Sequence, residues 1–230
     1  MSIAENVIKT EERIQKACAS GGRKREEITL MGVSKFVPID RVQEAWLAGI
    51  RCFGESRVRE GIEKFETFAA GHPGISLHLI GSLQRNKAKS AALFFDCVQS
   101  VDRPALIGEL AKHARQEKPL DVLLELHTGE ESKSGFAGLD DLFRAAEMVL
   151  QSANLKSAGL MTMAPFTGDE GLIRSSFRQL VRAQAELERR FPPKENWACL
   201  SMGMSNDFEI AVEEGSTMLR IGSLIFKEHA

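Results

Sequence analysis

Short apolar runs alternate with amphipathic stretches along nearly the whole chain, and this alternation predicts repeated units of a strand followed by a helix. A helix over 2–20, ended by Gly21 and Gly22, precedes the first unit. The expected strands cover 28–35, 50–54, 76–80, 97–100, 120–126, 157–162, 197–200 and 217–221. The expected helices after them cover 38–49, 57–70, 86–93, 104–116, 139–151, 170–190, 205–214 and 224–227.

Eight such units predict parallel strands, because neighbouring parallel strands need a crossover connection. Eight strands close into a TIM-type (β/α)8 barrel, and the length of 230 residues is near the usual size of that fold. An open doubly wound sheet would need a glycine-rich fingerprint after its first strand, and the chain has no GxGxxG. We therefore expect an α/β fold with a single barrel domain over 1–230 and an extra N-terminal helix.

Charge and composition exclude several classes of function. The chain has 30 basic and 32 acidic side chains, so it has no electrostatic footprint for nucleic acid or an anionic membrane. The four cysteines, at 18, 52, 97 and 199, lack the close pairing of a zinc site, and we expect no metal. No apolar run approaches the roughly 20 residues of a membrane span, and the N-terminus is polar. We expect a cytoplasmic protein.

Lys35 is the first candidate for chemistry, because it is expected to end the first strand, where the active site of such a barrel lies. Met31, Val33 and Lys35 would share the face toward the barrel interior. Partial desolvation lowers the pKa of a lysine, and the neutral amine attacks an aldehyde to form a Schiff base. The alternative is a surface lysine whose stem lies along apolar surface, and the pattern alone favours it.

The loops after the seventh and eighth strands have the composition of a phosphate site. Ser201 and Gly203 stand in one loop and Gly222 and Ser223 in the other, each before a helix. Hydroxyl groups and free N–H groups at a helix start suit a phosphate, and barrels often bind one between these two loops. We expect Ser205 or Asn206 to cap the helix after the first loop. Each loop alone would fit an ordinary strand-to-helix turn.

Arg220 shares a face of the eighth strand with Met218 and Gly222. Enzymes that use pyridoxal 5′-phosphate (PLP) pair the pyridine nitrogen of the cofactor with an aspartate or an arginine. An arginine stays charged and has no acceptor, so it would keep that nitrogen unprotonated and make the ring a weaker electron sink. The alternative is that Arg220 forms one half of a structural ion pair.

Eight ordered blocks give the chain a resemblance to a known family. They are VSK at 33–35, FGE at 53–55, HLIG at 78–81, SVDR at 100–103, GEESKSG at 129–135, GLMTMAP at 159–165, SMGMSND at 201–207 and RIGS at 220–223. In this order they resemble the PLP homeostasis protein family, relatives of the barrel domain of bacterial alanine racemase. The resemblance implies intracellular buffering or delivery of PLP, with indirect effects on amino-acid pools and no established reaction.

The resemblance also implies a PLP aldimine on Lys35 and a set of cofactor contacts. The implied cofactor-binding residues are Lys35, Val33, Ser56, His78, Met163, Ser201, Gly203, Met204, Arg220, Gly222 and Ser223. The chain departs from the family after Glu55, where the family usually continues with Asn-Tyr and this chain has Ser56 and Arg57. The asparagine contact is then missing or is made by Ser56. Leu77 stands where the family often has tryptophan.

A PLP-dependent amino-acid racemase or a related low-activity PLP enzyme is the alternative function. Racemisation needs bases beside the substrate α-carbon, and alanine racemase supplies one from a tyrosine; this chain has no tyrosine. His78, Cys52 or a water molecule are the candidates for a second base. The family resemblance and the missing tyrosine therefore favour a PLP carrier without established turnover, whose partners are PLP and apo PLP-dependent enzymes. Racemase dimers complete their sites with a second domain, and its absence here favours a monomer. Lys133 is a candidate to receive PLP transiently, with a solvated loop lysine as the alternative.

Overall fold

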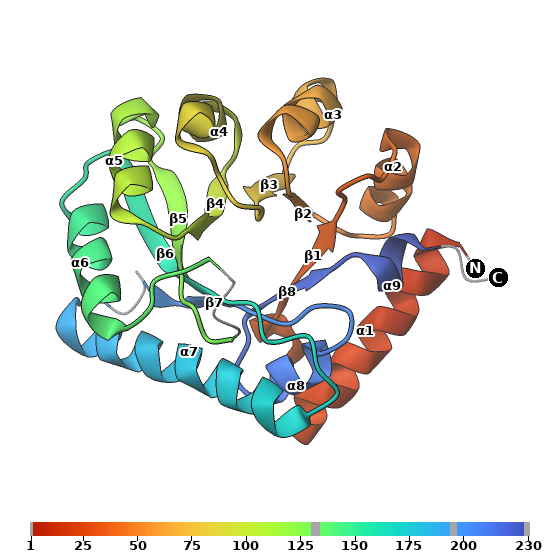
Figure 1. Ribbon diagram of the computed structural model, residues 1–230. Coiled ribbons are helices and arrows are strands. Elements are labelled where there is room, and N and C mark those ends of the chain that lie inside the picture. Colours follow the sequence, from red (N-terminus) through yellow and green to blue (C-terminus); the bar gives the residue numbers. More distant parts are fainter. Residues whose placement is uncertain (1, 130–133, 194–196, 228–230) are drawn as a thin grey trace.

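Eight parallel strands form a closed barrel in the computed structural model, which describes residues 2–129, 134–193 and 197–227 (Figure 1). Each strand pairs with the next one along the chain, and the last closes on the first through Gly32 and Ile221. The predicted (β/α)8 barrel is confirmed. The strands are β1 (Thr29–Val33), β2 (Cys52–Glu55), β3 (Ser76–Leu79), β4 (Cys97–Val101), β5 (Leu120–Glu125), β6 (Leu155–Met161), β7 (Cys199–Ser201) and β8 (Met218–Ile221).

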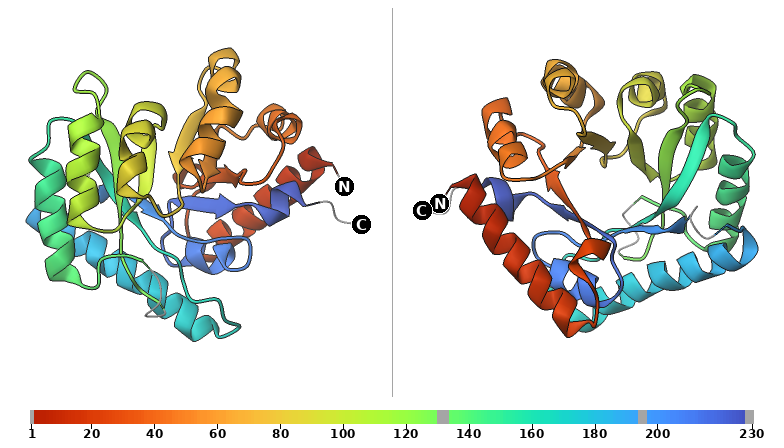
Figure 2. Two further views of the ribbon diagram at one scale, coloured as in Figure 1. Left: turned by 45° about the horizontal axis from the view of Figure 1, so that its top comes forward. Right: turned by 180° about the vertical axis from the view of Figure 1, so that it is seen from behind.

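Helices surround this barrel, and the extra N-terminal helix α1 (Ile3–Ser20) packs against α8, α9 and α2 (Figure 2). Ser2 and Glu5 form a reciprocal capping box at its start, which satisfies two otherwise unpaired N–H groups. The other described α-helices are α2 (Ile39–Leu47), α3 (Val58–Gly71), α4 (Ala88–Phe94), α5 (Pro104–His113), α6 (Leu139–Leu150), α7 (Glu170–Arg190), α8 (Phe208–Glu213) and α9 (Ser223–Phe226). Short 3-10 helices cover Arg25–Glu27 and Arg85–Lys87.

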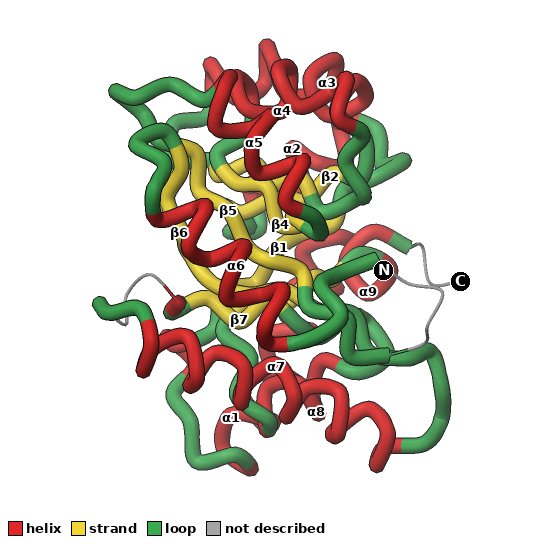
Figure 3. The backbone as a smooth tube through the Cα atoms, turned by 60° about the vertical axis from the view of Figure 1, so that its left-hand side comes forward, coloured by secondary structure: helices red, strands yellow, loops and turns green. Residues whose placement is uncertain are grey.

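The main core lies between the strands and the surrounding helices, where Phe53, Phe65, Phe177 and Trp197 are fully buried. In Figure 3 the barrel strands occupy the centre of the view, with α2 to α5 above them and α1, α7 and α8 below. Two smaller apolar clusters fill part of the barrel interior, one around Met31 and the other around Leu123 and Met161. Polar side chains occupy the rest of that interior and lead to the candidate site.

Three local predictions need correction. β1 ends at Val33, because the chain turns at Ser34, whose carbonyl accepts the Val37 N–H at 3.0 Å. β7 begins at Cys199, two residues late, because Trp197 packs outside the barrel, where its indole N–H donates to the Phe191 carbonyl.

The capping prediction for the helix after β7 is also wrong. α8 begins at Phe208, so Asp207 occupies the N-cap position that we expected for Ser205 or Asn206. The Asp207 carboxylate does not bond the helix. It accepts the Met204 N–H at 2.5 Å and so folds the loop before the helix. The sequence pattern located the loop and missed its internal hydrogen bond.

Candidate functional site

The C-terminal ends of β1, β7 and β8 bring several of the predicted residues together. A Cβ at Gly222 would lie 3.3 Å from the Val33 carbonyl oxygen and 3.4 Å from the Val33 Cβ, so the end of β1 touches the loop after β8. The Arg220 N–H donates to the Gly203 carbonyl at 2.9 Å and ties β8 to the loop after β7. Val33, Gly203, Arg220 and Gly222 therefore meet at one end of the barrel.

Lys35 lies two residues beyond β1, in the turn from Ser34 to Val37. Val33 is buried, as the alternation predicted, and Met31 lies in the barrel interior. The Lys35 side chain is exposed, so the expected desolvation of its amine is not found. The turn places the lysine just beyond the C-terminal end of β1, whose last residue, Val33, lies against Gly222 in the loop after β8.

The loop from Ser201 to Met204 depends on the glycine at its centre. Gly203 has a φ of +95°, a conformation that residues with a side chain rarely adopt. A Cβ there would lie 2.6 Å from the Ala211 Cβ and 2.9 Å from a Leu219 methyl carbon. Glycine thus lets the backbone of this loop pack directly against α8 and β8. At the centre of this loop, main-chain atoms and no side chain face the barrel mouth.

The start of α9 is the second part of the predicted phosphate site. The Gly222 carbonyl accepts the N–H groups of Ile225 and Phe226, which closes the first turn. The N–H groups of Ser223 and Leu224 open that turn, where a helix has no internal acceptors for them. No side chain caps the helix at Gly222. Ser223 is half-buried, and its N–H can serve an anion at the barrel mouth.

A chain of hydrogen bonds crosses the barrel interior below these loops. Arg220 Nη1 donates to the Ser201 hydroxyl at 2.8 Å, and that hydroxyl donates to Gln99 Oε1 at 2.6 Å. Gln99 Nε2 lies 2.8 Å from His78 Nδ1, and His78 Nε2 lies 2.9 Å from the Ser76 hydroxyl. With the Gln99 oxygen facing the Ser201 hydroxyl, the Gln99 amide N–H donates to His78 Nδ1, and the neutral ring then has its proton on Nε2. The Ser201 hydroxyl is thus engaged inside the barrel.

Burial controls the charges along this chain. It lowers the pKa of His78 to about 4, because the interior disfavours a charged ring, so the imidazole is neutral near pH 7. It lowers the pKa of Arg220 to about 10, which leaves the guanidinium charged. Arg220 Nη2 donates to the Thr162 carbonyl at 2.8 Å. Among the described residues no carboxylate lies within direct ion-pair distance of Arg220, and the charges of Asp207 and Glu125 act on it from farther away and favour its charged form.

Comparison with known proteins places the chain in a family. The family model for the N-terminal domain of alanine racemase matches residues 12–230. The chain is 38% identical, over 99% of its length and 96% of the relative, to a protein named pyridoxal phosphate homeostasis protein in Vibrio cholerae. The chain belongs to this family of pyridoxal phosphate homeostasis proteins, which share the barrel of alanine racemase.

Solved structures agree with this membership. PipY from Synechococcus elongatus with PLP bound has a TM-score of 0.80 and 33% identity, over 93% of this chain and 100% of that one. An alanine racemase from E. faecalis has a TM-score of 0.72 at 16% identity and covers 100% of this chain but only 59% of the racemase. The second likeness concerns the fold alone.

The remaining predicted residues of this family member lie around the mouth or below it. Ser56 follows β2, and a Cβ at Gly81 would lie 2.1 Å from the Ser56 carbonyl oxygen, so the loops after β2 and β3 touch. Ser56 also lines a cavity of about 400 Å³ with Arg57 and Lys87. Met163 is half-buried just after β6. Lys133 lies outside the described residues.

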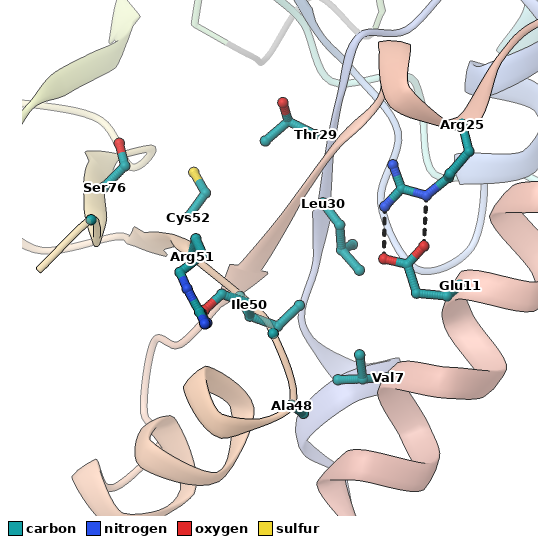
Figure 4. A pocket seen from close by; sticks show the side chains of 12 residues that line it. Val7, Glu11, Arg25, Thr29, Leu30, Ala48, Ile50, Arg51, Cys52 and Ser76 are labelled. Carbon is teal, nitrogen blue, oxygen red and sulfur yellow. Dashed lines mark hydrogen bonds and ion pairs between the residues drawn. The ribbon is translucent and has the colours of Figure 1, made fainter. Parts of the chain in front are cut away.

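Neither side chain considered as a second base suits that role. Both ring nitrogens of His78 are occupied, and the ring is too weakly basic to hold a proton at neutral pH. Cys52 begins β2 at the opposite end of the barrel, and burial raises the pKa of its thiol. Figure 4 shows Cys52 beside a cavity of about 430 Å³ there, walled by the Arg25–Glu11 pair and lined by none of the predicted cofactor residues.

Three polar residues of the interior escaped the sequence analysis. Gln99 is fully buried in β4, Glu125 ends β5, and Thr162 supplies the carbonyl that holds Arg220. Burial raises the pKa of the Glu125 carboxyl, which accepts a hydrogen bond from Ser134. A glutamine in the middle of an apolar strand was a visible signal, since a buried amide must find partners. The described residues hold no group of three His, Cys, Asp or Glu placed to share a metal, and none of the described helices has the length and hydropathy of a membrane span.

We expect His78 to make folding sensitive to acid. Its pKa is about 4 in the folded protein, against about 6.5 in the unfolded chain, so the unfolded chain binds a proton first as the pH falls. The stability that this group contributes is complete above pH 6.5 and is lost between about 6.5 and 4, by about 3 kcal/mol in all. The free energy of unfolding, measured with urea between pH 7.5 and 4.5, should fall less in His78→Gln than in the wild-type protein. In the control variant His113→Gln, which changes a histidine of α5, it should fall as much as in the wild type. Equal slopes in all three proteins would contradict this assignment.

Proposed function

We propose that the protein binds PLP at the C-terminal end of the barrel and serves in the intracellular homeostasis of PLP, by buffering or delivering it. The observation that carries the proposal is Arg220. It is a buried cation without a direct ion pair in the described structure. Its guanidinium donates hydrogen bonds to the Ser201 hydroxyl and the Thr162 carbonyl, near the barrel end at which Lys35 lies. The PLP bound to the related PipY supports the same ligand here.

The residues at this mouth fit three parts of PLP, namely its aldehyde, its phosphate and its pyridine nitrogen. When bound, PLP supplies an aldehyde carbon that bonds covalently to a lysine amine and a ring that withdraws electrons. We propose that Lys35 Nζ makes the covalent bond, since it follows the end of β1, which touches the loop after β8. The N–H groups of Gly203, Gly222 and Ser223 would hold the phosphate, and Met204, whose own N–H donates to Asp207, would line the site. Val33, Ser56, His78 and Met163 would line or support the site.

Ser201 takes a different role from the one the resemblance implied. Its hydroxyl joins Arg220 to Gln99, so we propose that it orients the guanidinium from below and that the loop backbone meets the phosphate. Arg220 would then present its remaining N–H groups to the pyridine nitrogen. Since an arginine donates and does not give up its proton, the nitrogen stays unprotonated and the ring remains a weak electron sink. This arrangement favours storage of PLP over catalysis.

The proposal extends to the setting in which the protein works. We propose that the whole chain, 1–230, acts as one PLP-binding domain, as a monomer in the cytoplasm, and that apo PLP-dependent enzymes receive its PLP. The racemase alternative lacks a suitable second base among the side chains considered for it, because neither His78 nor Cys52 fits that role. Changes in amino-acid pools would then follow from the supply of PLP to other enzymes.

Equilibrium binding of PLP by the apo-protein tests the proposal. We expect saturable binding of one PLP per chain, weaker binding of pyridoxal, which lacks the phosphate, and transfer of the bound PLP to an added apo-enzyme. A panel of L- and D-amino acids is the second arm of the experiment. Absence of saturable binding would refute the proposal, and turnover of an amino acid at ordinary enzyme rates of about 1–10³ s⁻¹ would replace it with the enzyme alternative.

A further inference from the structure

A buried ion pair lies behind the turn that carries Lys35, and the proposed site does not use it. Lys64 Nζ of α3 lies 2.8 Å from Glu55 Oε1 at the end of β2, and the two side chains are 13% and 1% exposed. A Cβ at Gly61 of α3 would lie 3.3 Å from the Glu55 Cβ and Cγ. The carboxylate therefore sits between β2 and α3, on the outer side of the barrel wall.

The pair holds Ser34, the residue before Lys35, through several hydrogen bonds. The Ser34 hydroxyl donates to Glu55 Oε1 at 2.7 Å, and Lys64 Nζ donates to the Ser34 carbonyl at 2.6 Å. The Ser34 N–H donates to the Gly54 carbonyl at 3.0 Å. The same Ser34 carbonyl also accepts the Val37 N–H that closes the turn. The position of the turn is thus tied to Lys64 and Glu55.

The turn itself is strained. Phe36 has a φ of +61°, and it is the one residue other than glycine with a positive φ in the described chain. It stands third in a four-residue turn closed from Ser34 to Val37, the position where a type II turn favours glycine. Its ring is 72% exposed, with the Arg57 guanidinium 5.4 Å from the ring centroid, so burial of the ring contributes little to hold this backbone. The strain must be offset by contacts elsewhere in the turn.

Glu55 depends closely on its partners. Its second oxygen, Oε2, is buried and has no hydrogen bond in the described structure. A buried carboxylate is costly unless it is paired, so this charge relies on Lys64 and Ser34 for its compensation. A pair of apolar residues would pack between β2 and α3 without that cost. An apolar pair could not form hydrogen bonds to Ser34. The charged pair forms two, one from the Ser34 hydroxyl to Glu55 and one from Lys64 to the Ser34 carbonyl.

We propose that Lys64 and Glu55 are positioning residues for Lys35, which hold the Ser34–Val37 turn in its strained form and so fix where the lysine is presented. The inference rests on the proposed function in one respect, that Lys35 is the residue that reacts with PLP. It adds a cause for the placement of that residue, from a pair that lies between β2 and α3.

Lys64→Met tests the inference with two readouts. In the protein without PLP, hydrogen exchange of the Val37 amide should be about tenfold faster, because the turn opens more readily. The rate at which PLP is fixed on Lys35 by borohydride should fall by about tenfold or more, since small displacements of a reacting group are costly. Arg59→Met is the matched control: Arg59 pairs with Glu63 on the exposed face of the same helix, and both readouts should stay at wild-type values.

A rescue experiment separates positioning from a loss of general stability. Glycine adopts a positive φ without strain, so Phe36→Gly in the Lys64→Met protein should restore most of the labelling rate at Lys35. The double variant Glu55→Gln/Lys64→Met removes the unpaired buried charge and keeps the inference testable if Lys64→Met folds poorly. We expect it to regain stability and still to label Lys35 slowly.

The outcomes distinguish this inference from the proposed function. If Lys64→Met and the double variant show wild-type exchange at Val37 and wild-type labelling at Lys35, the positioning role is refuted. Labelling that follows thermal stability across all variants, with no rescue by Phe36→Gly, would also refute it. If the wild-type protein itself fails to label at Lys35, the proposed function fails, while the exchange of the Val37 amide still decides whether the pair holds the turn.

Discussion

Alanine at position 203 is expected to destabilise the protein by about 2–4 kcal/mol and to weaken the binding of PLP. The added Cβ would meet Ala211 at 2.6 Å, Leu219 at 2.9 Å and the Phe208 backbone at 3.1 Å, in a conformation that already disfavours a side chain. The loop would have to move away from α8 and from the barrel mouth. Urea unfolding gives the stability, and the ratio of the dissociation constants of PLP and pyridoxal reports the phosphate contact.

Gly49→Ala is the matched control for this variant. Gly49 has a φ of +101°, close to that of Gly203, but a Cβ there would meet nothing within 4 Å. Only the backbone strain should remain, so we expect a loss of about 1 kcal/mol and no change in the PLP-to-pyridoxal ratio. If Gly203→Ala cost no more than Gly49→Ala and left the ratio unchanged, the close packing of this loop would have no role in phosphate binding.

Arg220→Leu is expected to lower the affinity for PLP by about 10- to 100-fold, as the loss of a hydrogen bond from a charged group does. Its effect on stability should be modest, about 1–3 kcal/mol, because the variant removes a costly buried cation but leaves the buried Thr162 carbonyl without its donor. The Ser201 hydroxyl keeps its bond to Gln99 in the variant. A PLP titration and a urea curve on the same preparation measure the two effects.

Arg174→Leu serves as the comparison for Arg220. Arg174 pairs with Glu213 and Glu214 on the surface, so its loss should change stability modestly and leave the affinity for PLP as it is. The opposite behaviour of Arg220→Leu, a large loss of stability with unchanged affinity, would mean that Arg220 has a structural role only.

The fold was predictable because each strand is a short apolar run bounded by polar residues. The boundaries failed where long-range packing decided them. Trp197 looked like the start of a strand, but the indole packs outside the barrel against Phe191. Lys35 looked like a strand end, but the chain turns at Ser34, because Lys64 and Glu55 hold it from another unit of the barrel. Local periodicity has no information on such partners.

The candidate site also has residues that the sequence could predict and residues that it could not. Lys35, Arg220 and the two loops could be found from their place at strand ends and from the family resemblance. The hydrogen-bond chain through Gln99 could not, because its members come from β3, β4, β7 and β8 and meet only when the barrel closes. Glu55 belongs to the block at 53–55, but the sequence assigned it no role, because its partner Lys64 stands on the following helix.

We propose that Lys35 holds PLP covalently, and mapping of that bond is the decisive experiment. The protein is loaded with PLP, reduced with borohydride, digested and examined by peptide mass spectrometry, with Lys35→Ala in parallel. We expect a yellow protein before reduction and a single labelled peptide that contains Lys35, with neither in the variant. A colourless protein, or a label spread over other lysines and unchanged in Lys35→Ala, would contradict it.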